Sequence, residues 1–393
     1  MNQHMKQHMN QHMNQHMNQY MKQHMKQHMK QHMKQHIKQR MKKTLLATAL
    51  LATACAAHAQ APLMVYGNID LGLIKRDGAA LNIGKRDHNR LGVKGTGELG
   101  AGIKALFQLE IGYEPDTGTR ATGANEGRPG SGQRPLFQGQ SWVGLKGGLG
   151  VVRIGRGLSA FQETSMAFEP WHGLPTPAGF QTDIMVAGFT SGPLGAPGSS
   201  ADRLSDAVFY HSPEWNGLQL NATVAARESP PGGLAVPPLY PSGAQASANP
   251  FSLSTTYKNG PLAGMLAVER NGVESEVYSI GASIDITRMV PGLKLMASYI
   301  RQDHSHTAPP GFDSARAWVL GANWAMGAGT LLAGYGQKSP EGVARTRQLS
   351  LGYEYSLSRR TQLYFDASRR RAAAPAAAAT RVNHFALGVN HAF

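Results

Sequence analysis

The residues that could do chemistry in this sequence are charged side chains on or next to segments that alternate in polarity. Four basic and three acidic positions stand out: Arg90, Lys94, Arg153, Arg156, Glu163, Glu169 and Asp183. None belongs to a recognisable catalytic motif, because neither a paired-carboxylate motif nor a Ser/His arrangement surrounds them. Opposite fixed charges that face each other across water would act on passing ions instead. The chemistry that these residues predict is therefore electrostatic.

Two other motifs predict binding chemistry only weakly. His304 and His306 could form a metal pair, but no third ligand follows at a suitable spacing. The glycines of GTGELGAG, residues 95–102, resemble a phosphate loop, yet the segment lacks the terminal Lys-Ser/Thr and leads into a strand. We therefore expect no metal site, no cofactor and no enzymatic activity.

The segments that must position these charges have a period of two. In residues 381–393, Phe385, Leu387, Val389 and Phe393 alternate with small or polar residues. Residues 63–73 and 103–113 repeat the pattern, with Leu, Ile and Val on one face and polar or charged side chains on the other. This period is typical of a strand with two unlike faces.

Sixteen such strands are predicted, which makes the chain all-β. They are 63–73, 89–94, 103–114, 137–146, 151–156, 206–211, 218–227, 251–257, 262–271, 276–287, 293–303, 316–325, 330–337, 346–356, 362–370 and 381–393. Short and long connections tend to alternate, and the longest, residues 157–203, leaves directly from Arg156. An even strand count with this asymmetry is typical of a transmembrane barrel whose charged inner face meets water. A soluble sandwich with its charged side outward is the rival architecture.

The first 59 residues differ from the rest. Residues 1–40 repeat variants of MNQH and MKQH, which predicts disorder or a start codon assigned too early. Residues 41–59 predict a signal peptide cleaved after Ala59, although Cys55 also allows a lipoprotein signal. Nine of the 39 basic residues and none of the acids lie in this leader, so residues 60–393 carry 30 basic and 24 acidic residues, net +6. This balance argues against nucleic acid as a partner.

Several stretches resemble the general porins of Gram-negative bacteria, of the neisserial and β-proteobacterial type. They are MVYGNIDLG, NRLGVKGTGELGAGIKALFQLEIGY, LFQGQSWVGLKGGLGVVRIGR, SDAVFYHSPEWNGLQL and LGVNHAF, in that order from residue 64 to 393. The resemblance implies a sixteen-stranded barrel in the outer membrane, with short periplasmic turns, long external loops and a third loop folded into the lumen. It also implies a homotrimer, contact with outer-membrane lipid and lipopolysaccharide, insertion by the barrel-assembly machinery, and a role for Phe393 in the assembly signal.

These expectations converge on a water-filled channel for ions and small hydrophilic solutes. If loop 157–203 folds inward, its acids face the basic wall residues across the narrowest point. Four basic wall positions against three loop acids favour anions weakly. A channel or receptor specific for one solute class is the alternative, and an outer-membrane esterase or protease barrel would need a catalytic set that the sequence does not show.

Overall fold

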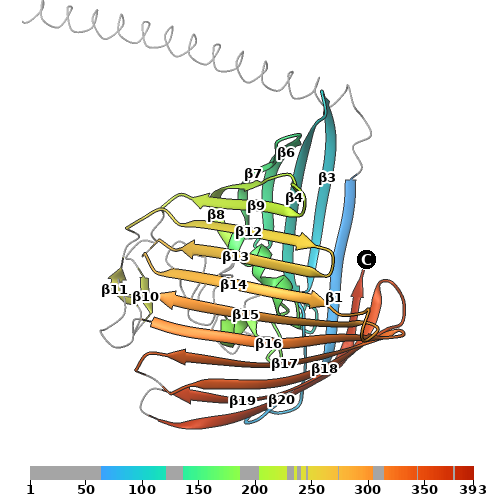
Figure 1. Cartoon of the computed structure of the whole chain (residues 1–393), viewed down its shortest axis with the longest axis vertical. Helices are drawn as coiled ribbons and strands as arrows, with labels where there is room; N and C mark the ends of the chain where they lie inside the picture. Colours follow the sequence, from blue (N-terminus) through green and yellow to red (C-terminus); the bar gives the residue numbers. More distant parts are fainter. Residues whose placement is uncertain are drawn as a thin grey trace, which may run out of the picture. The chain divides into compact units, whose positions relative to one another are not determined.

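The computed structural model describes residues 63–120, 136–185, 203–227, 234–236, 240–244, 247–272, 274–303, 314–342, 344–374 and 377–393. Sixteen long strands in these ranges form one antiparallel sheet (Figure 1). They are β1 (Leu63–Arg76), β3 (Arg90–Gly100), β4 (Ile103–Glu114), β6 (Gln140–Gly147), β7 (Gly150–Leu158), β8 (Arg203–His211), β9 (Leu218–Ala225), β12 (Phe251–Asn259), β13 (Leu262–Arg270), β14 (Glu276–Asp285), β15 (Leu293–Asp303), β16 (Ser314–Met326), β17 (Gly329–Pro340), β18 (Thr346–Ser356), β19 (Thr361–Ala374) and β20 (Ala377–Ala392). The predicted antiparallel sixteen-stranded barrel is confirmed.

The barrel closes between its first and last strands. β1 pairs with β3 from Leu63 to Asn68 and with β20 from Asn68 to Arg76. At the C-terminus, the backbone N–H groups of Gly67 and Phe393 each donate to the other's carbonyl over 3.1 Å. Every long strand therefore has neighbours on both sides, so no open edge is left among the sixteen.

Four short strands within the described ranges lie where only loops were expected. β2 (Asn82–Gly84) pairs with β1, β5 (Thr119–Arg120) pairs with β4, and β10 (Leu234–Val236) pairs with β11 (Tyr240–Ala244). The reason for β2 is visible in the register. β3 begins opposite Asn68, which leaves that edge of β1 open beyond this residue, and β2 covers part of it.

The two faces of the sheet differ as the alternation requires. On β20, Phe385, Leu387 and Val389 are exposed on the outward face, whereas His384 and Ala386, which alternate with them, are buried on the inward face. Exposed Leu, Ile, Val and aromatic residues recur on the outward faces of the other strands, and they suit contact with lipid. No helix among the described residues combines the length and apolar character needed to cross a bilayer.

The alternation predicted a polar inner face, but part of this face is apolar. A buried apolar cluster joins inward residues of β13–β17 to the segment that follows β7; its members are Phe161, Trp171, Ala178, Phe180, Ile184, Met185, Ala267, Val277, Ile300, Ala317, Val319 and Leu332. This segment contains α2 (Ala160–Ser165), a 3-10 helix (Met166–Phe168) and a π-helical turn (Gln181–Met185). The inner wall here is apolar because the loop, rather than water, covers it.

Candidate functional site

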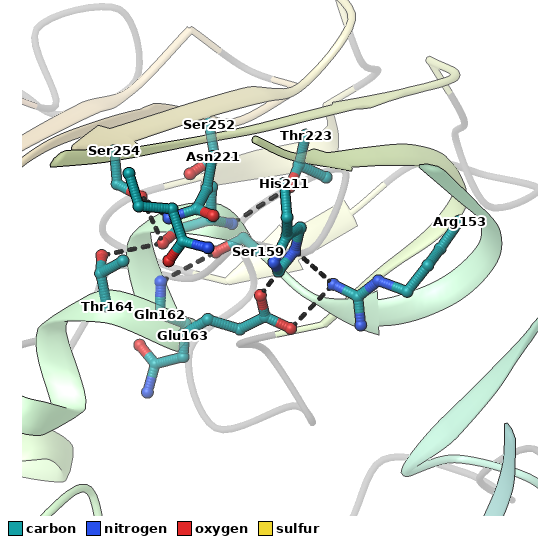
Figure 2. A network of polar contacts seen from close by, with 12 residues as sticks. Arg153, Ser159, Gln162, Glu163, Thr164, His211, Asn221, Thr223, Ser252 and Ser254 are labelled. Carbon is teal, nitrogen blue, oxygen red and sulfur yellow. Dashed lines mark hydrogen bonds and ion pairs between the residues drawn. The ribbon is translucent and has the colours of Figure 1, made fainter. Parts of the chain in front are cut away.

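The segment after β7 is anchored to the inner wall by its first helical turn. Ser159 caps α2, because its Oγ accepts a hydrogen bond from the N–H of Gln162 over 3.2 Å. The next two N–H groups would otherwise lack partners. They donate to wall hydroxyls, Ala160 to Thr223 Oγ1 (3.1 Å) and Phe161 to Ser252 Oγ (2.7 Å). Figure 2 shows this network, which places α2 firmly against β9 and β12.

α2 presents Glu163 to two basic side chains of the opposite strands (Figure 2). Arg153 of β7 donates from Nη2 to Glu163 Oε1 over 2.9 Å, and His211 Nε2 of β8 lies 3.0 Å from Glu163 Oε2. Arg153 also stacks on the rings of Trp142 and Phe209, with its Cζ 5.2 and 5.0 Å from the ring centroids. The loop acid and the wall base predicted to face each other thus form an ion pair.

The charge state of Glu163 follows from these contacts. Burial raises its pKa, but the hydrogen bond from His211 and the charge of Arg153 together outweigh burial and hold the pKa below its usual range. Glu163 is therefore ionised at neutral pH. The same His211 Nε2 lies 2.7 Å from Arg153 Nη2. It can accept from Arg153 or donate to Glu163, but one nitrogen does not do both, so the tautomer decides which contact is a hydrogen bond.

Glu169 does not line the pathway, contrary to the expectation for this residue. Its side chain is fully buried, and its Oε2 accepts the N–H of Trp171 over 3.0 Å while Oε1 accepts the N–H of Gly173. The Glu169 carboxylate therefore stabilises the turn of the loop in which it lies. Burial raises the pKa of Glu169 to about 7, although these N–H donors and the charge of Arg86 act in the opposite direction.

Arg90 and Lys94 lie on the inner face of β3, as expected from their spacing. In the register they stand opposite Asn68 and Met64 of β1. The Lys94 Nζ lies 5.0 Å from the ring centroid of Tyr66, and the Arg90 guanidinium is 4.0 Å from Asp87. Both side chains remain substantially exposed, at 38% for Arg90.

Arg156 was expected beside Arg153 on the polar face, and the register shows otherwise. It pairs with Ser141 on the outward side, in the same run as Val152 and Ile154, because three residues separate it from Arg153. The pairing of β7 with β8 shifts between Gly155 and Gly157, and Arg156 donates to Gln138 O (3.0 Å) and Ser205 Oγ (2.8 Å). Arg156 therefore belongs to the distorted rim of the wall rather than to its inner face.

Three residues singled out in the sequence lie partly or wholly outside the described residues. Asp183 belongs to the turn Gln181–Met185, but its side chain lies outside the described residues. His304 and His306 also lie outside the described residues.

The inner wall contains further charges that were not singled out as site residues. Lys104 and Lys146 stand directly opposite each other on β4 and β6, and Lys104 pairs with Glu98 over 2.5 Å. Nearer the other end of the barrel, Glu110 accepts from Tyr66 Oη over 2.9 Å and Glu114 pairs with Lys85 over 2.7 Å. The alternation of β4 predicts that Lys104, Glu110 and Glu114 point inward. Their partners depend on the register between strands.

A second buried charge cluster joins two loops to the wall. Arg86, between β2 and β3, is almost completely buried and forms ion pairs with Glu354 (2.6 Å) and Asp366 (3.0 Å). Asp366 in turn accepts from Trp171 Nε1 over 2.9 Å, and Asp70 accepts from the Arg86 N–H over 2.7 Å. The sequence has no local signal for this cluster, because its members lie up to 296 positions apart in the numbering.

Comparison with known proteins matches the family described as Gram-negative porin over residues 46–374. A relative from Delftia acidovorans, outer membrane porin protein 32, is 26% identical over 81% of this chain and 86% of its own length. An outer membrane porin of Bordetella pertussis is 28% identical over 81% of this chain and 91% of its own length. The major outer membrane protein P.IB of Neisseria lactamica is 25% identical, with 80% and 89% covered.

Solved structures agree on the fold. The anion-selective porin from Comamonas acidovorans superimposes with a TM-score of 0.66 at 21% identity, covering 85% of this chain and all of that one. A Vibrio cholerae outer membrane protein, OmpT, in a form described as a trimer gives a TM-score of 0.57 at 13% identity, with 84% and 99% covered. At such identities the likeness concerns the barrel architecture.

Proposed function

The chain belongs to the Gram-negative porin family and forms a channel in the outer membrane, and we propose that this channel passes small hydrophilic solutes with a weak preference for anions. Porins of this family are channels rather than enzymes. The family and the closed barrel support passive diffusion through water. The preference for anions comes from the charges of the described inner wall.

The preference for anions is inferred from a difference in burial between the acidic and the basic side chains of the inner wall. Of the acids near the pathway, Glu169 is fully buried, and Glu110 and Glu114 are less than a tenth exposed. Glu98 is exposed, but it is paired with Lys104 over 2.5 Å. Glu163 is ionised but stands against Arg153 and His211. The bases differ: Lys94 and Lys146 are exposed and Arg90 is partly so. Mobile ions therefore meet more positive than negative charge, and fixed charge acts over about 10 Å at 0.1 M salt.

Reversal potentials in a KCl gradient test this proposal. Arg90→Ser combined with Lys94→Ser should lower the chloride-to-potassium permeability ratio by about fivefold, since each of the two unit charges, some 5–10 Å from an ion in water, changes its energy by roughly 0.5 kcal/mol. Arg156→Ser is the matched control, because Arg156 belongs to the outward side, and it should leave the ratio near that of the wild type. A cation-preferring wild type, or a double variant with an unchanged ratio, would refute the proposal.

We also propose that the functional unit is a homotrimer. The support is architectural: OmpT of Vibrio cholerae, an outer membrane protein of similar fold, is described in a trimer form. Purified protein inserted into planar bilayers should give conductance steps grouped in threes, and its mass in detergent should be that of three chains. Single independent steps together with the mass of one chain would exclude a trimer.

The mature protein is proposed to begin at Gln60, after removal of residues 1–59, and to reach the outer membrane through the barrel-assembly machinery, where lipopolysaccharide surrounds it. The strand that starts at Leu63 supports this boundary. N-terminal sequencing of protein purified from the outer membrane tests it. A first residue other than Gln60 would move the cleavage site.

A further inference from the structure

Three arginines stand directly opposite one another on the outward face of β18–β20. Arg347 pairs in register with Arg371, and Arg371 pairs with Arg381. Arg369, one outward position further along β19, adds a fourth charge. We call these four residues the arginine row. All four side chains are exposed, and the three strands lie side by side in Figure 1.

Such a row is unfavourable by itself. Like charges directly opposite each other in a sheet repel. Residues 367–393 contain neither Asp nor Glu. One acid from elsewhere in the chain, Asp77, lies beside the row: its Oδ2 accepts from the N–H and the Nδ2 of Asn383 over 2.9 and 2.8 Å. A single carboxylate against four arginines leaves most of the repulsion unrelieved. Within the described part of the chain, the contacts of the row are with amides: Arg347 Nε donates to Gln337 Oε1 (3.0 Å) and Arg369 Nε to Asn383 Oδ1 (2.9 Å). Both bonds use Nε, so they leave the Nη groups of Arg347 and Arg369 able to bind an anion.

Another outward arginine pair on the same barrel has acids near it that can offset its positive charge. Arg301 of β15 stands opposite Arg316 of β16, also outward. There, however, the next pair of outward residues is Glu276 opposite Asp303. Asp303 is one outward position, about 7 Å along the strand, from Arg301. Because no such pair of acids lies next to the arginine row, its charges need an anion from outside the chain.

The position of the row along the barrel axis indicates where that anion lies. On β18 the outward residues after Arg347 are Leu349 and Leu351, both exposed and apolar. On β20, Phe385 and Leu387 follow Arg381 and Asn383 in the same way. Consecutive outward residues are about 7 Å apart along a strand, so the row lies just beyond the apolar band. It lies at the barrel end that bears the longest connections, which is the extracellular end in such proteins.

We propose that the arginine row binds the phosphate groups of lipopolysaccharide in the outer leaflet. The lipid A portion of this glycolipid carries phosphates at the boundary between acyl chains and water, and guanidinium groups bind phosphate oxygens through paired hydrogen bonds. A second copy of the chain is the competing occupant, because a threefold assembly would bring a different face of the neighbouring barrel against this row; the oligomeric mass in the test below distinguishes it. The inference rests on the proposed lipopolysaccharide contact and gives that contact its residues.

The test measures lipid A binding to the folded, detergent-solubilised protein by native mass spectrometry. Bis-phosphorylated lipid A is the probe, and inorganic phosphate is the competitor. The triple variant R347Q/R371Q/R381Q should weaken binding about a hundredfold, and R371Q alone about fivefold, from the usual contribution of one basic residue near an anionic lipid surface. Replacing the same three residues by Lys should retain most of the affinity.

The matched control is R359Q/R360Q. These exposed arginines belong to the turn at the other end of the same β18–β19 hairpin, so the charge change is comparable but the location is periplasmic. This variant should bind lipid A like the wild type. An unchanged single-channel conductance in the triple variant would show that the barrel is folded and would separate this inference from the channel function.

Three results would overturn the inference. The first is a triple variant, or an R371Q variant, that binds lipid A as tightly as the wild type. The second is displacement of lipid A from the wild type by inorganic phosphate at equal concentration, which would indicate a site for a free anion. The third is a triple variant that loses its oligomeric mass while it keeps lipid A affinity, which would indicate an interface between copies.

Discussion

At the scale of single residues, burial decides what a charge does in this barrel. Glu163 and Glu169 lie six positions apart in one loop, yet they have opposite roles. Glu163 reaches two bases of the wall and stays ionised. Glu169 is enclosed by its own turn, and burial raises its pKa to about 7. Only Glu163 therefore keeps its full negative charge at neutral pH.

Replacing Glu163 should make the channel more anion-selective. Glu163→Gln removes the negative charge that opposes Arg153 and keeps the size of the side chain. We expect the chloride-to-potassium permeability ratio to rise by about twofold, because a unit charge changes the energy of an ion roughly 7 Å away in water by about 0.5 kcal/mol. Reversal potentials at neutral pH measure this rise. A lower ratio in the variant would contradict the role assigned to Glu163.

Glu169 should make stability depend on pH near neutrality. Its folded pKa of about 7 exceeds the ordinary value of 4.5. Between these values the folded state holds a proton that the unfolded state has lost, so stability increases as pH falls from about 7 to about 4.5 and is lower above pH 7. The full difference is about 3 kcal/mol.

Glu169→Gln resembles the protonated side chain and should remove this contribution. The thermal midpoint of the wild type, relative to that of the variant, should rise between pH 8 and pH 5. Both thermal midpoints are measured at each pH from the heat-induced loss of the folded barrel, which is detected by its migration on a gel. Parallel profiles for the two proteins would show that Glu169 does not titrate in this range.

At the scale of elements, the loop after β7 behaves as part of the wall. Trp171 and Phe180 pack edge to face with ring centroids 5.9 Å apart, inside the apolar cluster on β13–β17. The Trp171 indole lies against Gly352, where a Cβ would be 3.0 Å from its Cζ2, and donates to Asp366. The loop is therefore held against the inner wall by packing and by a buried hydrogen bond.

Trp171→Ala should loosen this loop without breaking the barrel. Truncation of a buried aromatic residue costs about 3–5 kcal/mol, and here the cost falls on the attachment of the loop. Single-channel recordings should show larger current noise and a broader distribution of conductance. Trp318→Ala is the control, because Trp318 packs on Tyr335 on the outward face. Equal noise in both variants would mean that Trp171 does not hold the loop.

At the scale of the whole molecule, the last residue completes the barrel. Phe393 exchanges two backbone hydrogen bonds with Gly67, and its ring lies over that glycine, where an added Cβ would be 2.2 Å from Cζ. Gly67 is therefore needed for space, and Phe393 for pairing. The first and last strands of the barrel meet at this point of the sheet.

Deleting Phe393 should lower the amount of protein in the outer membrane severalfold, because unpaired backbone groups in or near lipid cost several kcal/mol each. Gly67→Val should have a similar effect through the clash with the ring. Phe393→Tyr keeps the ring and the backbone, so it should accumulate like the wild type. Immunoblots of membrane fractions compare the three. Wild-type levels of the deletion would refute a role in closure or assembly.

The sequence by itself determined the class of fold and the number of strands. Alternation with period two depends on neighbouring residues only, so it identified the strands and placed Arg90 and Lys94 on one inner face. The same counting reveals that Arg153 and Arg156, three residues apart, fall on opposite faces of an undistorted strand. The quoted motifs also sufficed to indicate the family.

Only the tertiary structure decided which charges act and which are enclosed. Register and loop position depend on contacts between distant segments, and a one-residue shift reverses every side chain of a strand. The buried turn of Glu169, the Arg86 cluster and the apolar inner wall all arise from such contacts. So does the arginine row, because Arg347, Arg371 and Arg381 meet only when three strands pair in one register.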